Sequence, residues 1–259
     1  MKNIYSNGNI GIIGCGWLGL HLSKHLSASY NIYTTTRSEA KKTQLSTQDF
    51  EVTVVDFSAR VGEWVHIARL DSIIITVPFA KRESPEVLLQ RFENIHLFLK
   101  GYYKQLFLLS SIGIYPEIEA EITENTFTDE ELQPNLIQVE RYLKKLFPQL
   151  NILRLGGLMG QNRIFSNFKP QPTEQRVNHV HYEDICLIVE QMISKNCMAK
   201  CYNVVAPEHP TKREIISYQK GITIPHMTDE KPFGKVVLSD LLQLELNYEF
   251  KNPDPIRFK

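Results

Sequence analysis

Apolar residues along this chain fall into short runs of strand length that alternate with stretches of helical periodicity. The runs favour six strands, and apolar residues spaced three to four apart favour helices between them. The predicted strands are Ile10–Ile13, Asn31–Thr35, Glu51–Val55, Ser72–Val77, Gln105–Leu109 and Asn151–Leu155. This alternation is typical of a parallel sheet covered by helices on both faces, so we predict an α/β, doubly wound fold.

The pattern changes after Gly157, where prolines and glycines break the chain into short elements. In this part we expect strands at Val177–His181, Tyr202–Val205 and Gly221–Pro225, and helices at Glu183–Lys195 and Lys212–Lys220. We therefore predict a first domain over residues 1–157, with core elements also contributed by 177–206, and a smaller, irregular substrate-side lobe over 158–259.

The first predicted strand runs directly into three glycines, Gly14, Gly16 and Gly19, before a helical pattern that begins with Trp17 and Leu18. This Gly-x-Gly-x-x-Gly spacing is typical of a dinucleotide site. The first glycine permits a sharp turn, the second leaves room for a pyrophosphate, and the third lets the helix pack close to the strand. The N–H groups at the start of the helix then face the anion. We predict a Rossmann-type dinucleotide-binding domain with these five residues at the cofactor.

The end of the second strand indicates which dinucleotide binds. An NAD site usually carries Asp or Glu at this point, to accept hydrogen bonds from the ribose 2′-hydroxyl. Here the chain has Arg37 instead, flanked by Thr36 and Ser38. A guanidinium can pair with a 2′-phosphate, so we predict NADP in preference to NAD, with NAD still possible. The alternative is that Arg37 is a solvated residue that opens the next helix.

Polar or conformationally special residues also follow four other predicted strands, at the edge where such sheets bind ligands. We predict that they outline one crevice and contact the cofactor. They are Asp56, Phe57, Thr76, Val77, Pro78, Ser110, Gly156 and Gly157. The two glycines can equally form a turn, and Pro78 can simply end a strand.

Composition narrows the class of partner. The chain has 29 Lys and Arg and 29 Asp and Glu, so no net charge attracts nucleic acid or an anionic membrane. We expect only small-molecule or nucleotide partners. The longest apolar run, Ile73–Val77, is too short to span a bilayer, and we expect a cytoplasmic protein. The four cysteines form no C-x-x-C pair and are expected to be reduced; they are Cys15, Cys186, Cys197 and Cys201.

Two histidines, His179 and His181, share one face of a predicted strand. A zinc site would need further ligands, and none is evident nearby. We therefore predict packing histidines, which help to order Asp184, and no metal.

Several motifs occur in the order seen in extended short-chain dehydrogenase/reductases. The chain resembles the NAD-dependent epimerase/dehydratase superfamily, and more closely its small atypical branch. The motifs are the Gly14–Gly19 loop, Ser110–Tyr115, Leu153–Gly157, Asn178–Ile185 and Tyr202–Val205.

The resemblance implies a Tyr-x-x-x-Lys pair on the helix after the fifth strand, yet no Tyr here has a Lys four residues later. Aligning Glu140 with the family's glutamate on that helix puts Leu132 and Leu136 at the Tyr and Lys positions. Ser111, four residues before Tyr115, corresponds to the family's catalytic Ser. We predict that Ser111 polarises a carbonyl, and Tyr115, the only phenol nearby, is the candidate for a substitute acid. Alternatively, Tyr115 is a packing aromatic without a basic neighbour.

Two functions remain open. The first is an NADP-dependent oxidoreductase or epimerase-like enzyme that acts on a small or sugar-derived carbonyl. The second is a non-catalytic NAD(P)-binding sensor. The retained Ser111 and the second lobe favour the enzyme, and the missing pair favours the sensor. Apolar stripes on Pro85–Lys100 and Asn135–Phe147 are consistent with a homodimer contact or with ordinary core.

Overall fold

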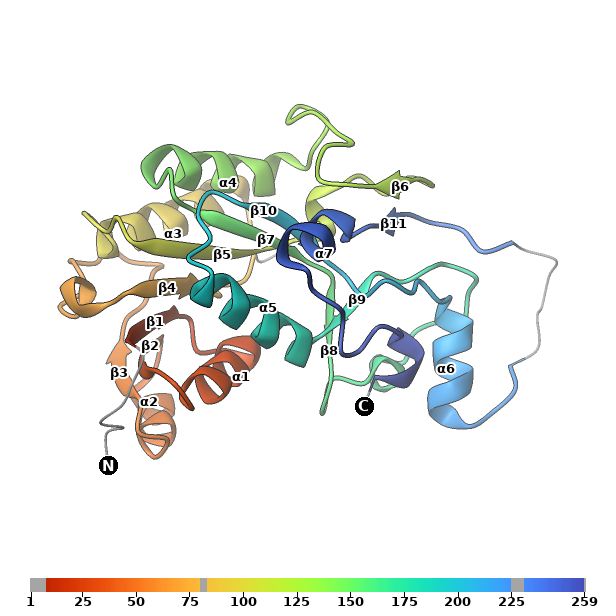
Figure 1. Cartoon of the computed structure of the whole chain (residues 1–259), viewed down its shortest axis with the longest axis horizontal. Helices are drawn as coiled ribbons and strands as arrows, with labels where there is room; N and C mark the ends of the chain where they lie inside the picture. Colours follow the sequence, from red (N-terminus) through yellow and green to blue (C-terminus); the bar gives the residue numbers. More distant parts are fainter. Residues whose placement is uncertain (1–7, 80–82, 225–230, 259) are drawn as a thin grey trace. The chain divides into compact units, whose positions relative to one another are not determined.

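The computed structural model describes residues 8–79, 83–224 and 231–258. Its main sheet has seven strands in the order β10-β7-β5-β4-β1-β2-β3 (Figure 1). The pairs β1–β2, β1–β4, β2–β3 and β4–β5 are parallel. The bounds are β1 Asn9–Ile13, β2 Asn31–Thr36, β3 Glu51–Val54, β4 Ser72–Ile75, β5 Gln105–Ser111, β7 Asn151–Leu155 and β10 Cys201–Val204. The predicted doubly wound α/β fold is confirmed.

Seven helices occur in the described residues. They are α1 Trp17–Leu26, α2 Glu39–Ser46, α3 Pro85–Phe98, α4 Pro134–Leu146, α5 Tyr182–Ser194, α6 Lys212–Lys220 and α7 Asp240–Leu246. Their ends have local causes. Ser84 accepts a hydrogen bond from the Val87 N–H just before Pro85, and Thr211 forms a capping box with Glu214. Gly221, with φ of +63°, ends α6 in the left-handed region that glycine favours.

The chain forms two compact units whose segments interleave. Unit 1 comprises Met1–Ser110, Leu132–Leu153 and Glu190–Cys201, and unit 2 comprises Ser111–Glu131, Arg154–Val189 and Tyr202–Lys259. The chain passes between the units inside β5, β7, α5 and β10.

Unit 1 has the apolar strands that a sheet covered on both faces requires. Ile73, Ile74 and Ile75 of β4 are all fully buried, as are Leu106 and Leu108 of β5. Helices α3 and α4 pack side by side on one face of the sheet, and α1 covers the other (Figure 1). The sheet order reverses at β1, which pairs with β2 on one side and with β4 on the other. In open α/β sheets this reversal opens a crevice at the carboxyl ends of the strands.

Unit 2 contains two small parallel sheets. Strand β6, Glu121–Ile122, pairs with β11, Val236–Val237, and β8, Gly157–Met159, pairs with β9, His179–His181. The strand predicted at Gly221–Pro225 is wrong over 221–224, because Gly221 ends α6 and no strand follows in this stretch. Pro225 itself lies outside the described residues.

Candidate functional site

A cavity of about 570 Å³ in unit 1 collects the ends of β1, β2, β3 and β4. We call it the glycine-loop cavity. Its lining is Gly14, Cys15, Gly16, Thr35, Thr36, Arg37, Ser38, Lys41, Val55, Asp56, Phe57, Ser58, Thr76, Val77, Pro78, Glu83 and Arg91. A volume in this range fits a small ligand or part of a dinucleotide.

The loop after β1 is fixed to both neighbouring strands. Gly14 has φ of +93°, which a residue with a side chain rarely adopts. Its N–H donates to Thr35 Oγ1 at 2.9 Å, and the Cys15 N–H donates to the Thr35 carbonyl at 2.8 Å. From the other side, the Thr76 hydroxyl donates to the carbonyls of Ile13 and Gly14. The loop is therefore held in place by Thr35 and Thr76, two residues of the cavity wall.

The second and third glycines of the loop meet different surroundings. A Cβ built on Gly16 would lie no closer than 4.0 Å to the Gly14 carbonyl oxygen, and Gly16 is exposed. A Cβ on Gly19 would lie 2.5 Å from that same oxygen. Within the described residues, then, protein packing requires glycine at Gly19 and leaves open space at Gly16. Helix α1 also starts without a side-chain cap, so its first N–H groups remain available to an anion.

Cationic and hydroxyl groups gather at the end of β2. Arg37 is exposed, Lys41 lies in the first turn of α2, and Ser38 caps that helix by accepting a hydrogen bond from the Lys41 N–H at 3.3 Å. Across the described part of the chain, the Arg37 guanidinium forms no hydrogen bond or ion pair. Hydrogen bonds from the Ser58 backbone and side chain hold the pKa of Asp56 below its usual value, and the nearby Arg37 adds to this effect. This end of the cavity can accept a phosphate.

Glu83 and Arg91 form an ion pair on another part of the wall of the glycine-loop cavity. Arg91 of α3 binds Glu83 through both terminal guanidinium nitrogens, each at 2.5 Å from a carboxylate oxygen. These hydrogen bonds lower the pKa of the Glu83 carboxyl, and the charge of Arg37 lowers it further. Glu83 is thus ionised and lies within electrostatic reach of two arginines.

The structure brings together most of the predicted cofactor residues. Those that line the glycine-loop cavity are Gly14, Gly16, Thr36, Arg37, Ser38, Asp56, Phe57, Thr76, Val77 and Pro78. Trp17, Leu18 and Gly19 belong to the first turn of α1, next to this lining. Sequence reasoning missed Lys41, Glu83 and Arg91. Lys41 could have been found from its place one helical turn after Arg37, but no sequence signal joins Glu83 and Arg91 to the loop.

The remaining predicted cofactor residues have local roles in the structure. The buried Ser110 hydroxyl donates to the Glu140 carboxylate of α4 at 2.6 Å. A Cβ on Gly156 would lie 2.7 Å from the Asn178 carbonyl oxygen, and one on Gly157 would lie 2.5 Å from the His179 ring. Close packing of residues 156–157 against residues 178–179 accounts for both glycines, and their contact with a cofactor stays a prediction.

Ser111 and Tyr115 lie in unit 2, on either side of the short 3₁₀ turn Ile112–Ile114. Ser111 Oγ accepts a hydrogen bond from the Gly113 N–H at 3.1 Å and keeps its own proton for donation. Tyr115 is buried, and its hydroxyl donates to Asn203 Oδ1 at 2.7 Å. The expectation that Tyr115 lacks a basic neighbour is wrong, because Arg154 Nη1 donates to the phenol oxygen at 3.0 Å.

A lysine that the sequence analysis did not single out stabilises the turn that follows Ser111. Lys235 is buried, and its ammonium donates to the carbonyls of Ile112 and Tyr115 and to the Glu117 carboxylate at 2.9 Å. These three acceptors fix the position of the loop that follows Ser111.

The two leucines aligned with the missing acid/base pair are not both on the helix. Helix α4 begins at Pro134, so Leu132 precedes it, and only Leu136 lies in its first turn. Proline at the first helical position sets this start. Placing Leu132 on the helix was therefore wrong, although neither leucine can transfer a proton.

The histidines and cysteines behave as structural residues. His179 is buried, and burial, aided by the charge of Lys212, lowers its pKa to about 4. Asp184 accepts hydrogen bonds from the Tyr248 hydroxyl and from Lys251 and Asn252, so the C-terminal segment orders this carboxylate. Among the described residues, no group of His, Cys, Asp or Glu could hold a metal ion. No disulfide joins any two of the four cysteines, all of which lie in the described residues.

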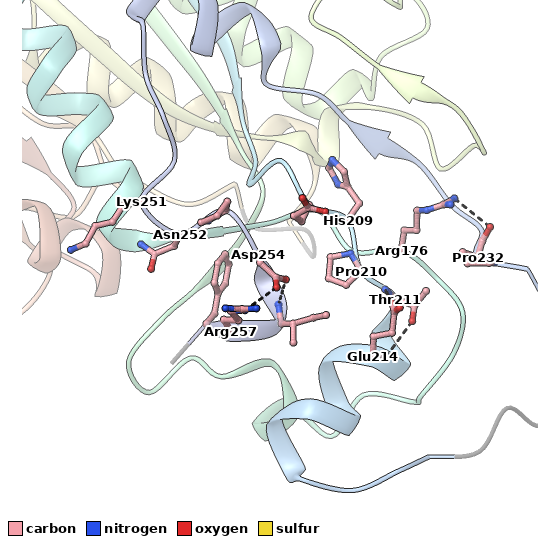
Figure 2. A pocket seen from close by; sticks show the side chains of 14 residues that line it. Arg176, His209, Pro210, Thr211, Glu214, Pro232, Lys251, Asn252, Asp254 and Arg257 are labelled. Carbon is pink, nitrogen blue, oxygen red and sulfur yellow. Dashed lines mark hydrogen bonds and ion pairs between the residues drawn. The ribbon is translucent and has the colours of Figure 1, made fainter.

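A second cavity, of about 800 Å³, lies within unit 2 between the start of α6 and the C-terminal segment (Figure 2). We call it the C-terminal cavity. Its charged groups have partners inside unit 2: Arg257 pairs with Asp254, Lys251 with Glu183, and Glu214 with the capped start of α6. Arg176 donates to the Pro232 carbonyl at 3.3 Å. The lining carries three basic and three acidic side chains, so its formal charges balance.

Comparisons with known proteins agree with this architecture. No family model matches the chain. Protein YeeZ of Escherichia coli (strain K12) is 25% identical over 267 aligned residues, which cover 95% of this chain and 97% of that protein.

Solved structures match over nearly the whole chain. A candidate NAD-dependent epimerase/dehydratase from Methylobacillus flagellatus superposes with a TM-score of 0.74 at 20% identity, covering 96% of this chain and 95% of that one. The dTDP-glucose 4,6-dehydratase of Bacillus anthracis str. Ames, solved in complex with NAD, gives 0.70 at 13% identity, with coverage of 96% and 94%. The predicted resemblance is confirmed at the level of the fold. No helix in the described residues is long and apolar enough to cross a membrane.

Proposed function

We propose that this chain is an atypical member of the NAD-dependent epimerase/dehydratase superfamily that binds NADP in the glycine-loop cavity. Its activity is that of an NADP-dependent oxidoreductase or epimerase-like enzyme on a small or sugar-derived carbonyl. The bound nicotinamide would supply hydride transfer, and the residues of the chain bind and orient the reactants. The solved neighbours that are NAD-dependent, or bind NAD, support the nicotinamide cofactor.

One observation carries the proposal: Arg37, Ser38 and Lys41 share a cavity with the glycine loop. The open space at Gly16 and the uncapped start of α1 fit a pyrophosphate. From there, the end of β2 is where the ribose of a dinucleotide lies in such folds. Two cations at that point favour a 2′-phosphate over a 2′-hydroxyl, because a charge-assisted hydrogen bond is about twice as strong as a neutral one.

Isothermal titration calorimetry with NADP⁺ and NAD⁺ tests the cofactor. Arg37→Ala should weaken NADP⁺ binding by about tenfold or more and leave NAD⁺ almost unchanged, because only NADP⁺ carries the phosphate. Lys41→Ala should have the same selectivity with a smaller effect, since an ammonium makes a single-point contact. Equal losses for both nucleotides would contradict the assignment of the 2′-phosphate site.

A second function, a non-catalytic NADP sensor, is favoured by the state of Tyr115. Its hydroxyl proton is donated to Asn203 inside the buried interior of unit 2, so the phenol is poorly placed to donate to a substrate. Incubation of the protein with NADPH and a panel of aldehydes, ketones and nucleotide sugars separates the two functions. Oxidation of NADPH with any carbonyl supports the enzyme. Tight NADPH binding without turnover on the whole panel supports the sensor.

A further inference from the structure

The ion pair between Glu83 and Arg91 lines the same cavity as the proposed 2′-phosphate site, although neither residue belongs to the glycine loop or to β2. We propose that Arg91 determines cofactor specificity without contacting the phosphate. It neutralises Glu83, which would otherwise pair with Arg37 and displace the 2′-phosphate. This inference rests on the proposed NADP site.

Arg91 forms a bidentate ion pair with Glu83. Both terminal nitrogens of the guanidinium are used, each 2.5 Å from a carboxylate oxygen, in the two-point arrangement that arginine forms with carboxylates. The Arg91 side chain is only 13% exposed, against 30% for Glu83. The Arg91 guanidinium is thus largely buried and hydrogen-bonded to Glu83. The Arg37 guanidinium is exposed and forms no such bond within the described residues.

Electrostatics explain why the pairing matters. The charge of Arg37 already lowers the pKa of Glu83, so the two side chains interact across the cavity. Asp56 is a second carboxylate in reach of Arg37, but hydrogen bonds from Ser58 hold it in place. Without Arg91, Glu83 would be an ionised carboxylate that shares the cavity with Arg37 and can pair with it. A 2′-phosphate would then have to displace a carboxylate from Arg37 and approach a second negative charge.

The same reasoning predicts different effects on NADP⁺ binding for the two partners of the ion pair. Removing Arg91 should weaken NADP⁺ binding, and removing the charge of Glu83 should not. Removing both should restore binding, because no carboxylate is left to compete. A direct phosphate contact by Arg91 predicts no such restoration.

The experiment is titration calorimetry with NADP⁺ and NAD⁺ on the full chain. Arg91→Met, which keeps most of the apolar volume, should weaken NADP⁺ binding by about tenfold, the equivalent of about 1.4 kcal/mol, and change NAD⁺ binding by less than about twofold. Glu83→Gln should bind NADP⁺ at least as tightly as the unmodified protein. The double variant should return to within about threefold of it, and Arg91→Lys, which keeps the charge, should stay close to it.

Lys104→Ala is the matched control, because it breaks the exposed Lys104–Asp71 ion pair of unit 1, outside the cavity lining. It should leave both affinities unchanged. A double variant as weak as Arg91→Met overturns the inference in favour of direct contact. Equal losses of NADP⁺ and NAD⁺ in Glu83→Gln and Arg91→Met overturn it in favour of a structural ion pair. No preference for NADP⁺ in the unmodified protein overturns the proposed function itself.

Discussion

At the scale of single residues, the glycines of the loop differ in why they are glycine. Gly14 needs a positive φ, and Gly19 needs a close approach between helix and loop. Gly16 has an ordinary φ of −74° and open surroundings, so the fold of the described residues does not require it. A ligand that approaches the backbone does explain it.

This difference gives a test with an internal control. Gly16→Val should fold normally but lose most of its affinity for NADPH, because the branched side chain fills the space assigned to the pyrophosphate. Gly19→Ala should instead lower the melting temperature, because its Cβ would lie 2.5 Å from a backbone oxygen. Calorimetry and thermal unfolding measure the two effects. Unchanged NADPH affinity in folded Gly16→Val would overturn the site assignment.

Ser111 is the residue on which the catalytic prediction depends. Its hydroxyl accepts from the Gly113 N–H and keeps a proton to donate to a carbonyl. On any substrate that the panel identifies, Ser111→Ala should lower turnover by about 10²-fold or more and leave NADPH affinity unchanged. Full activity of Ser111→Ala would place the active site elsewhere.

Tyr115→Phe distinguishes an acid from a packing aromatic. The change keeps the ring and removes a hydroxyl that bonds to Asn203 and Arg154. If Tyr115 only packs, the variant should lose about 1 kcal/mol of unfolding free energy and keep its turnover. A pH-dependent fall in turnover, without a matching loss of stability, would identify Tyr115 as the acid.

At the scale of helices and strands, the sequence predicts those elements whose ends are set by local residues such as helix caps. Helix α6 matches the prediction from Lys212 to Lys220, because Thr211 and Gly221 are strong end signals. The two-residue strands β6 and β11 and the helix α7 escaped prediction, because they are short and depend on tertiary partners. The partner predicted for Asp184 is also wrong: the donors come from residues 248–252, which no local pattern connects with the start of α5.

The Asp184 carboxylate links the start of α5 to the C-terminal segment by hydrogen bonds. Variants that remove more of these bonds should lose more unfolding free energy. Asp184 is fully buried and accepts four hydrogen bonds, two of them from backbone N–H groups. Asp184→Ala leaves those buried donors unsatisfied and should cost about 3 kcal/mol of unfolding free energy. Tyr248→Phe removes one donor and should cost about 1 kcal/mol. Equal stability of all three proteins in urea unfolding would contradict this role.

At the scale of the whole molecule, the sequence predicts the sheet but not the division into units. Strand-length runs and the glycine loop identify the strands β1 to β5 and β7 in their order along the chain. The chain then crosses between units within single strands, as at Ser110–Ser111 and Leu153–Arg154. The sequence carries no sign of these crossings, because each falls inside a strand whose residues on both sides are buried or half-buried. The sequence also could not indicate that Glu83 and Arg91 line the cavity of the glycine loop, because this contact is tertiary and joins residues more than 60 positions apart.

The stability of the whole protein should depend on pH through His179. Burial, aided by the charge of Lys212, lowers the pKa of His179 to about 4, whereas an unfolded histidine titrates near 6.5. The folded protein therefore keeps this imidazole neutral between those values, while the unfolded chain binds a proton. The contribution of the neutral His179 side chain to the free energy of unfolding is fully present above about pH 6.5. It is lost as the pH falls toward 4, by at most about 1.4 kcal/mol per pH unit. Urea unfolding from pH 7.5 to 4.5 measures this slope, and His179→Gln should flatten it. An equally steep slope in that variant would assign the acid sensitivity to other groups.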